Sequence, residues 1–234
     1  MTAPTTTTTL AYGPDRRAVD VHRPDGPPGP LPTVLLWHGR GPDERDVLAP
    51  LARAAAALGV LVAVPDWRPD APDGGRSHLL DSAAFARELA DGAPLVLAGW
   101  SLGARAAVAA ALAPAAFDGF RPHAAVGLAG SYDTPAVSTG TVPLDDLRTA
   151  DRGVPVHLLH GAGDLVVPAE RSRALHAALL AHGHPVTHRE PPTDHAGAIG
   201  GEYSPEARRC LPATGPRALA AGRAAAGLLA AAAR

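Results

Sequence analysis

Short apolar runs alternate along the chain with longer segments that mix small apolar and polar residues. The runs lie at residues 33–37, 60–64, 94–98, 124–129 and 154–159. They are too short for buried helices, and they are apolar on both faces, as strands are in a parallel sheet that is covered on both sides. A weaker final strand is expected at residues 185–189.

The segments between these runs have the composition and length of helices. Helices are predicted at residues 46–58, 77–90, 104–113, 169–182 and 216–234. Strands that alternate with helices predict an α/β fold, with a mostly parallel central sheet and helices on both of its faces. Ligands of such sheets bind at the carboxyl ends of the strands, so a site is expected there.

A chain of 234 residues suits one domain with a sizeable core. We expect residues 31–234 to form it. Residues 1–30 are rich in Thr, Pro and Gly, and we expect a flexible segment there with an edge strand near residues 17–22. The loop at 130–153 is long enough for only a minimal lid, which favours an open site.

The most specific motif is Gly99-Trp100-Ser101-Leu102-Gly103, which stands between a predicted strand and a predicted helix. A serine at so sharp a turn adopts a strained backbone conformation, and the residues two before and two after it must be very small. The two glycines meet that requirement. The motif therefore predicts that Ser101 is a nucleophile.

A serine hydroxyl needs an imidazole to take its proton, and the imidazole needs a carboxylate to orient it. Asp164 follows the last of the five apolar runs, and His195 lies a few residues beyond the weaker final strand. Both are therefore expected near Ser101 at one edge of the sheet. Asp133 is the alternative acid, and His188 is the alternative base.

At these residues the chain resembles the α/β-hydrolase fold superfamily, in particular small serine esterases and dienelactone hydrolases. The resemblance rests on the serine turn, the His38-Gly39 turn, the acid after the penultimate strand and the late histidine. It implies that Ser101, Asp164 and His195 are nucleophile, acid and base in that chain order. Dienelactone hydrolases normally have a cysteine at the nucleophile position, where this chain has serine.

The resemblance also implies where the remainder of the site lies. The backbone amides of Leu102 and Arg40 are expected to form the oxyanion hole, which stabilises the negative charge that develops when serine attacks. We expect Trp100, His38 and Gly39 to contact the substrate.

These residues predict a serine hydrolase that cleaves a carboxylic ester through an acyl-enzyme intermediate, with a small-molecule ester as its substrate. One triad also serves amidases, thioesterases and acyltransferases, and a hydrolase-like fold can serve as a non-catalytic binding module. These alternatives stay open at the level of sequence.

The composition of the chain limits the kinds of partner and cofactor that we expect. The formal net charge is −2, which gives no electrostatic reason to expect nucleic acid or a membrane as a partner. A single cysteine excludes an internal disulfide and a multi-thiolate metal site. The phosphate-binding and dinucleotide-binding glycine motifs are absent from the sequence, so no cofactor is expected. No metal is expected either, because His182, His184 and His188 fall on a helix end, a turn and a strand.

The ends of the chain give an expectation about location. The threonine tract at residues 1–10 lacks the basic start and apolar stretch of a signal peptide. The apolar segment at residues 216–234 is interrupted by arginines, which is typical of a helix packed on a sheet rather than a membrane span. We therefore expect a cytoplasmic protein, whose oligomeric state the sequence does not indicate.

Overall fold

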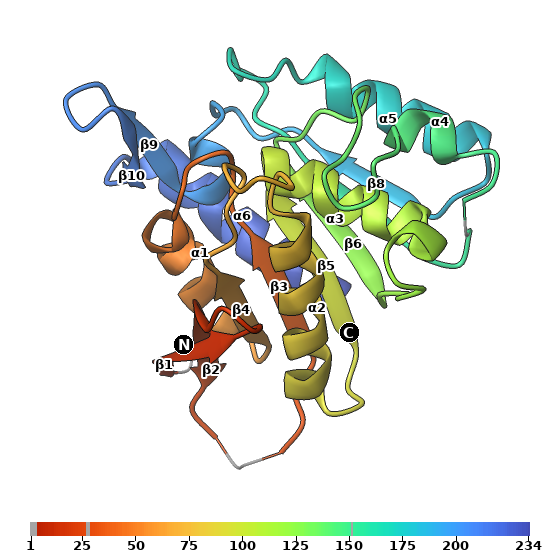
Figure 1. Cartoon of the computed structure of the whole chain (residues 1–234). Helices are drawn as coiled ribbons and strands as arrows, with labels where there is room; N and C mark the ends of the chain where they lie inside the picture. The colour runs from red at the N-terminus through yellow and green to blue at the C-terminus, as the bar shows by residue number, and fades with distance from the viewer. Residues whose placement is uncertain (1–3, 27–28, 151) are drawn as a thin grey trace.

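The computed structural model of the chain describes residues 4–26, 29–150 and 152–234. Its centre is an eight-stranded sheet with the strand order β1-β2-β4-β3-β5-β6-β7-β8 (Figure 1). From β4 to β8 in that order every pair is parallel, whereas β2 is antiparallel to both β1 and β4. The strands are β1 (Thr5–Tyr12), β2 (Arg17–Pro24), β3 (Thr33–Trp37), β4 (Leu61–Pro65), β5 (Leu95–Trp100), β6 (Ala124–Leu128), β7 (Val156–Leu159) and β8 (Val186–Arg189).

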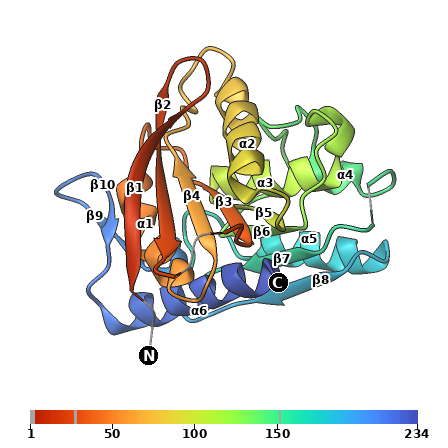
Figure 2. The same cartoon turned by 90° about the horizontal axis from the view of Figure 1, so that it is seen from below.

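Helices cover both faces of this sheet. Helices α1 and α6 pack together on one face, and α2 and α3 lie on the opposite face (Figure 2). Helix α5 packs beside α3 over β7. The helices are α1 (Arg45–Ala56), α2 (Arg76–Ala90), α3 (Leu102–Leu112), α4 (Pro143–Asp146), α5 (Glu170–Ala181) and α6 (Pro216–Ala232), with short 3-10 turns η1 (Pro114–Ala116) and η2 (Gly197–Ile199).

Strand β3 shows why the strands are apolar throughout. Successive side chains of a strand point to opposite faces of the sheet. Val34 and Leu36 accordingly belong to the core under α1 and α6, while Leu35 and Trp37 belong to the core under α2 and α3. All four side chains are fully buried, and burying one such side chain contributes about 1.5–3 kcal/mol.

The architecture confirms the α/β fold expected from the sequence. Each of the five apolar runs forms a parallel strand, and the weaker run forms β8 at the edge of the sheet. Each predicted helix is also present. In the loop at 130–153 the one regular element among the described residues is the four-residue helix α4.

The N-terminal region differs from the expectation of a flexible segment. Residues 5–24 form an antiparallel hairpin in which Thr5 pairs with Pro24 and Tyr12 pairs with Arg17. The edge strand expected near residues 17–22 is present as β2, but β1 covers it and forms the edge itself. Apart from the buried Tyr12 and the half-buried Thr5, the side chains of β1 are exposed, so the apolar pattern gave no signal. Threonine is β-branched and favours extended backbone, which explains why the tract forms a strand.

A second hairpin, β9 (Gly201–Ser204) with β10 (Arg209–Pro212), was also missed. It lies between η2 and α6 and stands apart from the main sheet (Figure 1). Its two strands are short and largely polar, so neither produced a recognisable strand pattern.

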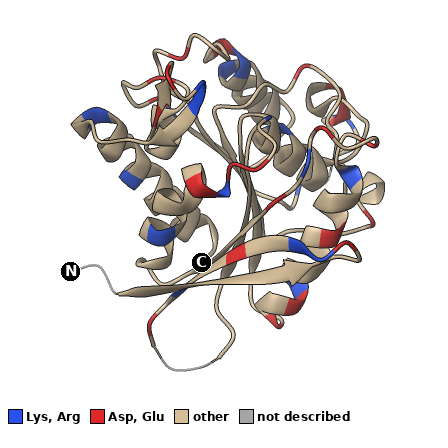
Figure 3. Ribbon diagram, turned by 60° about the vertical axis from the view of Figure 1, so that its left-hand side comes forward, with Lys and Arg blue, Asp and Glu red and all other residues tan. Residues whose placement is uncertain are grey.

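Charged residues of both signs are interspersed over the ribbon in the view of Figure 3. Within the part of the chain that the structure describes, no helix combines the length and the apolar character needed to cross a bilayer.

Two glycines of α6 provide a matched test of its packing. An added Cβ at Gly222 would lie 2.8 Å from the Cα of Gly200, whereas a Cβ at Gly227 would meet nothing within 4 Å. We expect Gly222→Ala to lower the free energy of unfolding by about 1–3 kcal/mol because backbone must move. Gly227→Ala should raise it by about 0.5–1 kcal/mol through helix propensity. Urea unfolding measures both, and equal effects of the two variants would contradict this packing.

Candidate active site

Ser101 lies at the turn between β5 and α3, at the carboxyl edge of the sheet. Its backbone has φ 56° and ψ −114°, in the left-handed half of conformational space that residues other than glycine rarely adopt. Such a conformation costs on the order of 1–3 kcal/mol and persists only where the surroundings enforce it. Here the Ser101 amide donates to the Leu128 carbonyl at 2.8 Å, which ties the turn to the neighbouring strand.

The two glycines around Ser101 are required by close backbone contacts. A Cβ at Gly99 would lie 2.2 Å from the carbonyl group of Gly103, and a Cβ at Gly103 would lie 2.4 Å from the Trp37 carbonyl oxygen. These contacts are with backbone atoms, which cannot rotate away. The structure thus supports the steric argument made from the sequence.

Asp164 and His195 form a hydrogen-bonded pair beside this turn. Asp164 follows β7, His195 follows β8, and His195 Nδ1 donates to Asp164 Oδ2 at 2.7 Å. The other carboxylate oxygen accepts the backbone amides of Val166 and Val167, each at 2.8 Å. The Asp164 side chain is fully buried, and His195 is nearly so. Because Nδ1 carries the proton, Nε2 of neutral His195 is left as a base.

These bonds hold Asp164 ionised. Burial opposes the charge, but the hydrogen bonds from His160, His195 and the Val167 amide outweigh burial and hold the pKa of Asp164 well below its usual range. Asp164 therefore presents a fixed negative charge to His195 at neutral pH.

His160 makes a second contact with the same carboxylate oxygen. Its Nε2 lies 3.1 Å from Asp164 Oδ2 and 2.8 Å from the Val167 carbonyl oxygen. Both neighbours accept hydrogen bonds, so Nε2 carries the proton and Nδ1 accepts the Ser172 hydroxyl at 2.7 Å. Ser172, His160 and Asp164 thus form a second serine–histidine–aspartate series, but Ser172 and His160 are both completely buried. No substrate can reach Ser172 in this arrangement.

Ser101 and His195 share the wall of one cavity of about 460 Å³. Leu102 and Arg40, the two residues expected to supply oxyanion donors, also line it, as does Trp100. Leu102 is the first residue of α3, where backbone amides have no partner within the helix. The structure therefore brings the expected nucleophile, base and oxyanion residues to one place, with Asp164 behind the base.

Trp100 also positions the histidine. Its indole Nε1 donates to the His195 carbonyl oxygen at 3.1 Å, and the two rings pack with their centroids 5.2 Å apart. His38 and Gly39, by contrast, are not among the described residues that line the cavity. His38 is fully buried behind the turn, and Gly39 packs against the Trp100 ring. Their expected contact with the substrate stays a prediction.

Two charged residues of the cavity were not anticipated. Glu44 precedes α1 and accepts the Gly41 amide at 3.0 Å, and burial raises its pKa. Arg105 follows Ser101 by one turn of α3 and donates to the carbonyl and hydroxyl of Ser131 at 2.9 and 2.7 Å. The position of Glu44 on the wall depends on tertiary contacts that the sequence does not show. Arg105 could have been found, because it follows Ser101 by four residues and therefore lies on the same face of α3.

The alternative acid and base lie elsewhere. Asp133 pairs with Arg171 on the surface. His188 lies in β8 and packs against His176, with ring centroids 5.4 Å apart. Neither Asp133 nor His188 lines the cavity of Ser101, as far as the described residues show. Of the candidate bases, His195 lines the cavity of Ser101, and of the candidate acids, Asp164 is hydrogen-bonded to His195.

Comparison with known proteins shows what this arrangement is similar to. No protein-family model and no curated protein sequence matches the chain. Solved structures do match. A thermostable esterase from Pseudomonas putida ECU1011 is 19% identical, with a TM-score of 0.68 over 100% of this chain and 84% of the other.

Two further structures extend this comparison. An S-formylglutathione hydrolase from Staphylococcus aureus is 15% identical, with a TM-score of 0.71 over 100% of this chain and 98% of the other. Carboxyl esterase 2 from Tuber melanosporum is 14% identical, with a TM-score of 0.69 over 100% of this chain and 89% of the other. These likenesses confirm that the chain has the α/β-hydrolase fold.

The low pKa of Asp164 predicts a specific pH dependence of stability. A carboxyl whose pKa is lower in the folded than in the unfolded chain stabilises the fold above the unfolded pKa of about 3.9, and that contribution is lost as pH falls toward the folded value. We expect wild type to lose stability more steeply than Asp164→Asn between about pH 5 and pH 3. Urea unfolding at a series of pH values tests this, and parallel curves for the two proteins would contradict it.

Proposed function

We propose that the chain is a serine hydrolase that cleaves carboxylic esters, with Ser101 as nucleophile, His195 as base and Asp164 as the acid that orients His195. The observation that carries the proposal is the buried Asp164–His195 hydrogen bond of 2.7 Å, with His195 on the wall of the cavity that also exposes strained Ser101. Strain at a residue of an accessible cavity is characteristic of functional sites.

The reaction follows from these positions. Ser101 Oγ attacks the ester carbonyl carbon while its proton passes to His195 Nε2, and the carbonyl oxygen becomes an oxyanion. The amides of Leu102 and Arg40 stabilise that oxyanion, a contribution of about 3–4 kcal/mol for each donor. The intermediate then collapses, the C–O bond breaks, and the alcohol leaves with the proton from His195.

Water completes the cycle. It attacks the acyl-enzyme carbonyl while His195 takes one of its protons, the bond to Ser101 Oγ breaks, and Ser101 recovers a proton from His195. The carboxylic acid product is released. Asp164 keeps its negative charge throughout and stabilises the protonated His195.

The surroundings of the cavity favour a small ester with an apolar group. An adjoining pocket of about 200 Å³ shares Val166 and His195 with the cavity and is lined mainly by apolar atoms. Leu165, Val166 and Tyr203 are all strongly exposed at this point, with Leu165 at 96%. Exposed apolar side chains that gather beside a polar site are typical of ligand binding. The names of the similar structures, which include esterases, support the same substrate class.

Two serine variants distinguish Ser101 from the buried Ser172 as the nucleophile. Ser101→Ala should reduce hydrolysis of p-nitrophenyl acetate by about 10⁴-fold without unfolding the protein, because the nucleophile is lost. Ser172→Ala removes the buried hydroxyl of the second series. It should keep activity within a few-fold of wild type and lower the free energy of unfolding by about 1 kcal/mol.

Steady-state hydrolysis and urea unfolding of the purified variants measure both effects. If Ser101→Ala keeps wild-type turnover, the proposed nucleophile is wrong. Wild type that hydrolyses neither p-nitrophenyl acetate nor the corresponding thioester and anilide would favour a binding module instead.

A further inference from the structure

A group of three metal-ligating side chains lies behind the turn that carries Arg40. His38 follows β3, Asp66 follows β4, and Asp43 lies just before α1. One ring nitrogen of His38 and one carboxylate oxygen each of Asp43 and Asp66 lie within 4.8 Å of one another. We call these three residues the His38 cluster. None of them lines the cavity of Ser101, so the cluster is separate from the proposed catalytic residues.

The hydrogen bonding of His38 leaves one ring nitrogen as an unused acceptor. Nδ1 lies 3.1 Å from the Gly39 carbonyl oxygen, which can only accept, so Nδ1 carries the ring proton. Nε2 of the neutral ring then holds a lone pair. It is buried in a side chain of 0% exposure and makes no hydrogen bond of normal geometry among the described residues, although the Trp67 backbone lies near the ring. A buried polar atom without a partner costs on the order of 1–3 kcal/mol, so the site favours a ligand for it.

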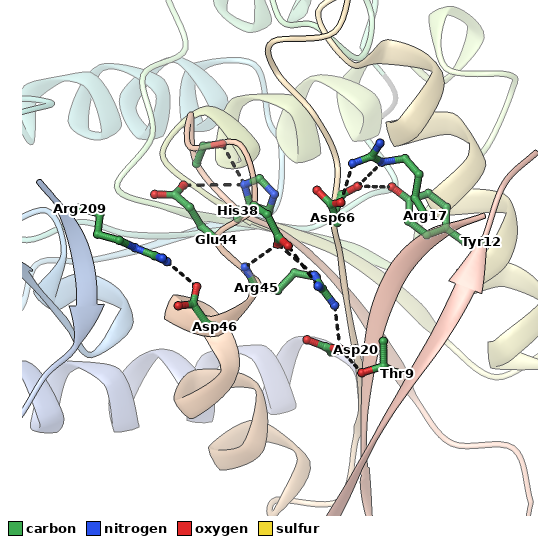
Figure 4. Close-up of polar contacts among 12 residues, drawn as sticks. Thr9, Tyr12, Arg17, Asp20, His38, Glu44, Arg45, Asp46, Asp66 and Arg209 are labelled. Carbon is green, nitrogen blue, oxygen red and sulfur yellow. Dashed lines mark hydrogen bonds and ion pairs between the residues drawn. The ribbon is translucent and has the colours of Figure 1, made fainter. Parts of the chain in front are cut away.

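The groups around the ring are negative. Glu44 lies on the side of the Nδ1 atom, 3.8 Å away, and Asp66 lies on the opposite side of the ring (Figure 4). Asp66 Oδ2 pairs with Arg17 at 2.5 Å, but Asp66 Oδ1 is buried and has no hydrogen-bond partner in the described part of the chain. His38 Nε2 and Asp66 Oδ1 are thus two buried acceptors without a hydrogen bond in one cluster, and a positive ligand would satisfy both.

The local charge also favours a cation. The network in Figure 4 joins the carboxylates of the cluster to Arg17 and Arg45, with Arg45 bound to Asp43 at 3.0 Å and to Asp20 at 2.8 Å. Asp20, Asp43, Glu44 and Asp66 therefore face two arginines, and acids outnumber bases even with Glu44 protonated.

We propose that the His38 cluster binds a divalent transition-metal cation such as Zn²⁺, with His38 Nε2 and one carboxylate oxygen each of Asp43 and Asp66 as its ligands. One imidazole and two carboxylates suit Zn²⁺, which binds such atoms at about 2.0–2.2 Å. The Gly39 carbonyl fixes the tautomer of the ring, as an outer-shell acceptor does in established metal sites.

Asp43 determines how a cation would reach the His38 cluster and how closely the ligand atoms could surround it. Its side chain is 40% exposed on the loop before α1, so it gives the cation a route from solvent. Bond lengths of this size place the ligand atoms around a tetrahedral zinc about 3.4 Å apart. The candidate ligand atoms of the His38 cluster lie within 4.8 Å of one another, so they would have to move closer together. Binding would therefore require the Asp43 side chain to move and to give up part of its paired hydrogen bonds to Arg45, at 3.0 and 3.1 Å. The bound cation would tie β3, β4 and the start of α1 together behind the Arg40 turn.

The test is a titration of tag-free, EDTA-stripped protein with ZnCl₂ by isothermal titration calorimetry, with thermal unfolding in parallel. Wild type should bind one Zn²⁺ saturably and unfold at a higher temperature with it, because the cation binds only the folded site. His38→Gln should abolish that binding. Asp43→Asn changes an exposed loop residue and should weaken binding about tenfold or more while the protein stays folded.

His22→Gln is the matched control. His22 is also buried with an unpartnered Nε2, but no pair of acids joins it in a cluster. This variant should bind Zn²⁺ as wild type does. The proposal is overturned if wild type shows no saturable binding, or if His38→Gln and Asp43→Asn bind as tightly as wild type. If His38→Gln fails to fold, Asp43→Asn alone decides.

Discussion

The absence of space beside Ser101 is the constraint on which the rest of the site depends. Strands β3 and β5 lie side by side, and the start of α3 packs against the Trp37 carbonyl so closely that Gly103 admits no Cβ. The chain makes this turn with Ser101 at φ 56°. Parallel strands bring the loops after β7 and β8 to the same edge of the sheet, where Asp164 and His195 meet. The buried sheet thus stabilises the strain and fixes the positions of the groups around it.

Much of this arrangement could be predicted because the information is local. A strand buried on both faces must be apolar at every position, so β3 to β7 were visible as apolar runs. The glycines at 99 and 103 could be interpreted because backbone contacts at a sharp turn allow no other residue. Asp164 and His195 could be assigned from their places after strands, because parallel topology fixes the edge at which strands end.

What could not be predicted depends on contacts between distant segments. Strand β1 has an exposed threonine face, and its pairing with β2 gives it order that no apolar pattern reveals. His38 was expected at the substrate, yet its ring is buried behind the turn. Its ring packs against Trp67, which follows β4, and sequence spacing does not encode that contact. The contact of His160 with Asp164 is local, but it was missed because the two residues lie in a loop, where a four-residue spacing does not fix the direction of the side chains.

The most direct test of the account is reaction of the folded protein with a fluorophosphonate probe, followed by peptide mapping with mass spectrometry. The probe phosphonylates a serine only where a neighbouring base activates it. The account predicts a single adduct on Ser101, with its formation slowed strongly by His195→Ala. An adduct on another serine, or an unlabelled Ser101 in folded protein, would contradict the central claim that this residue is an activated nucleophile.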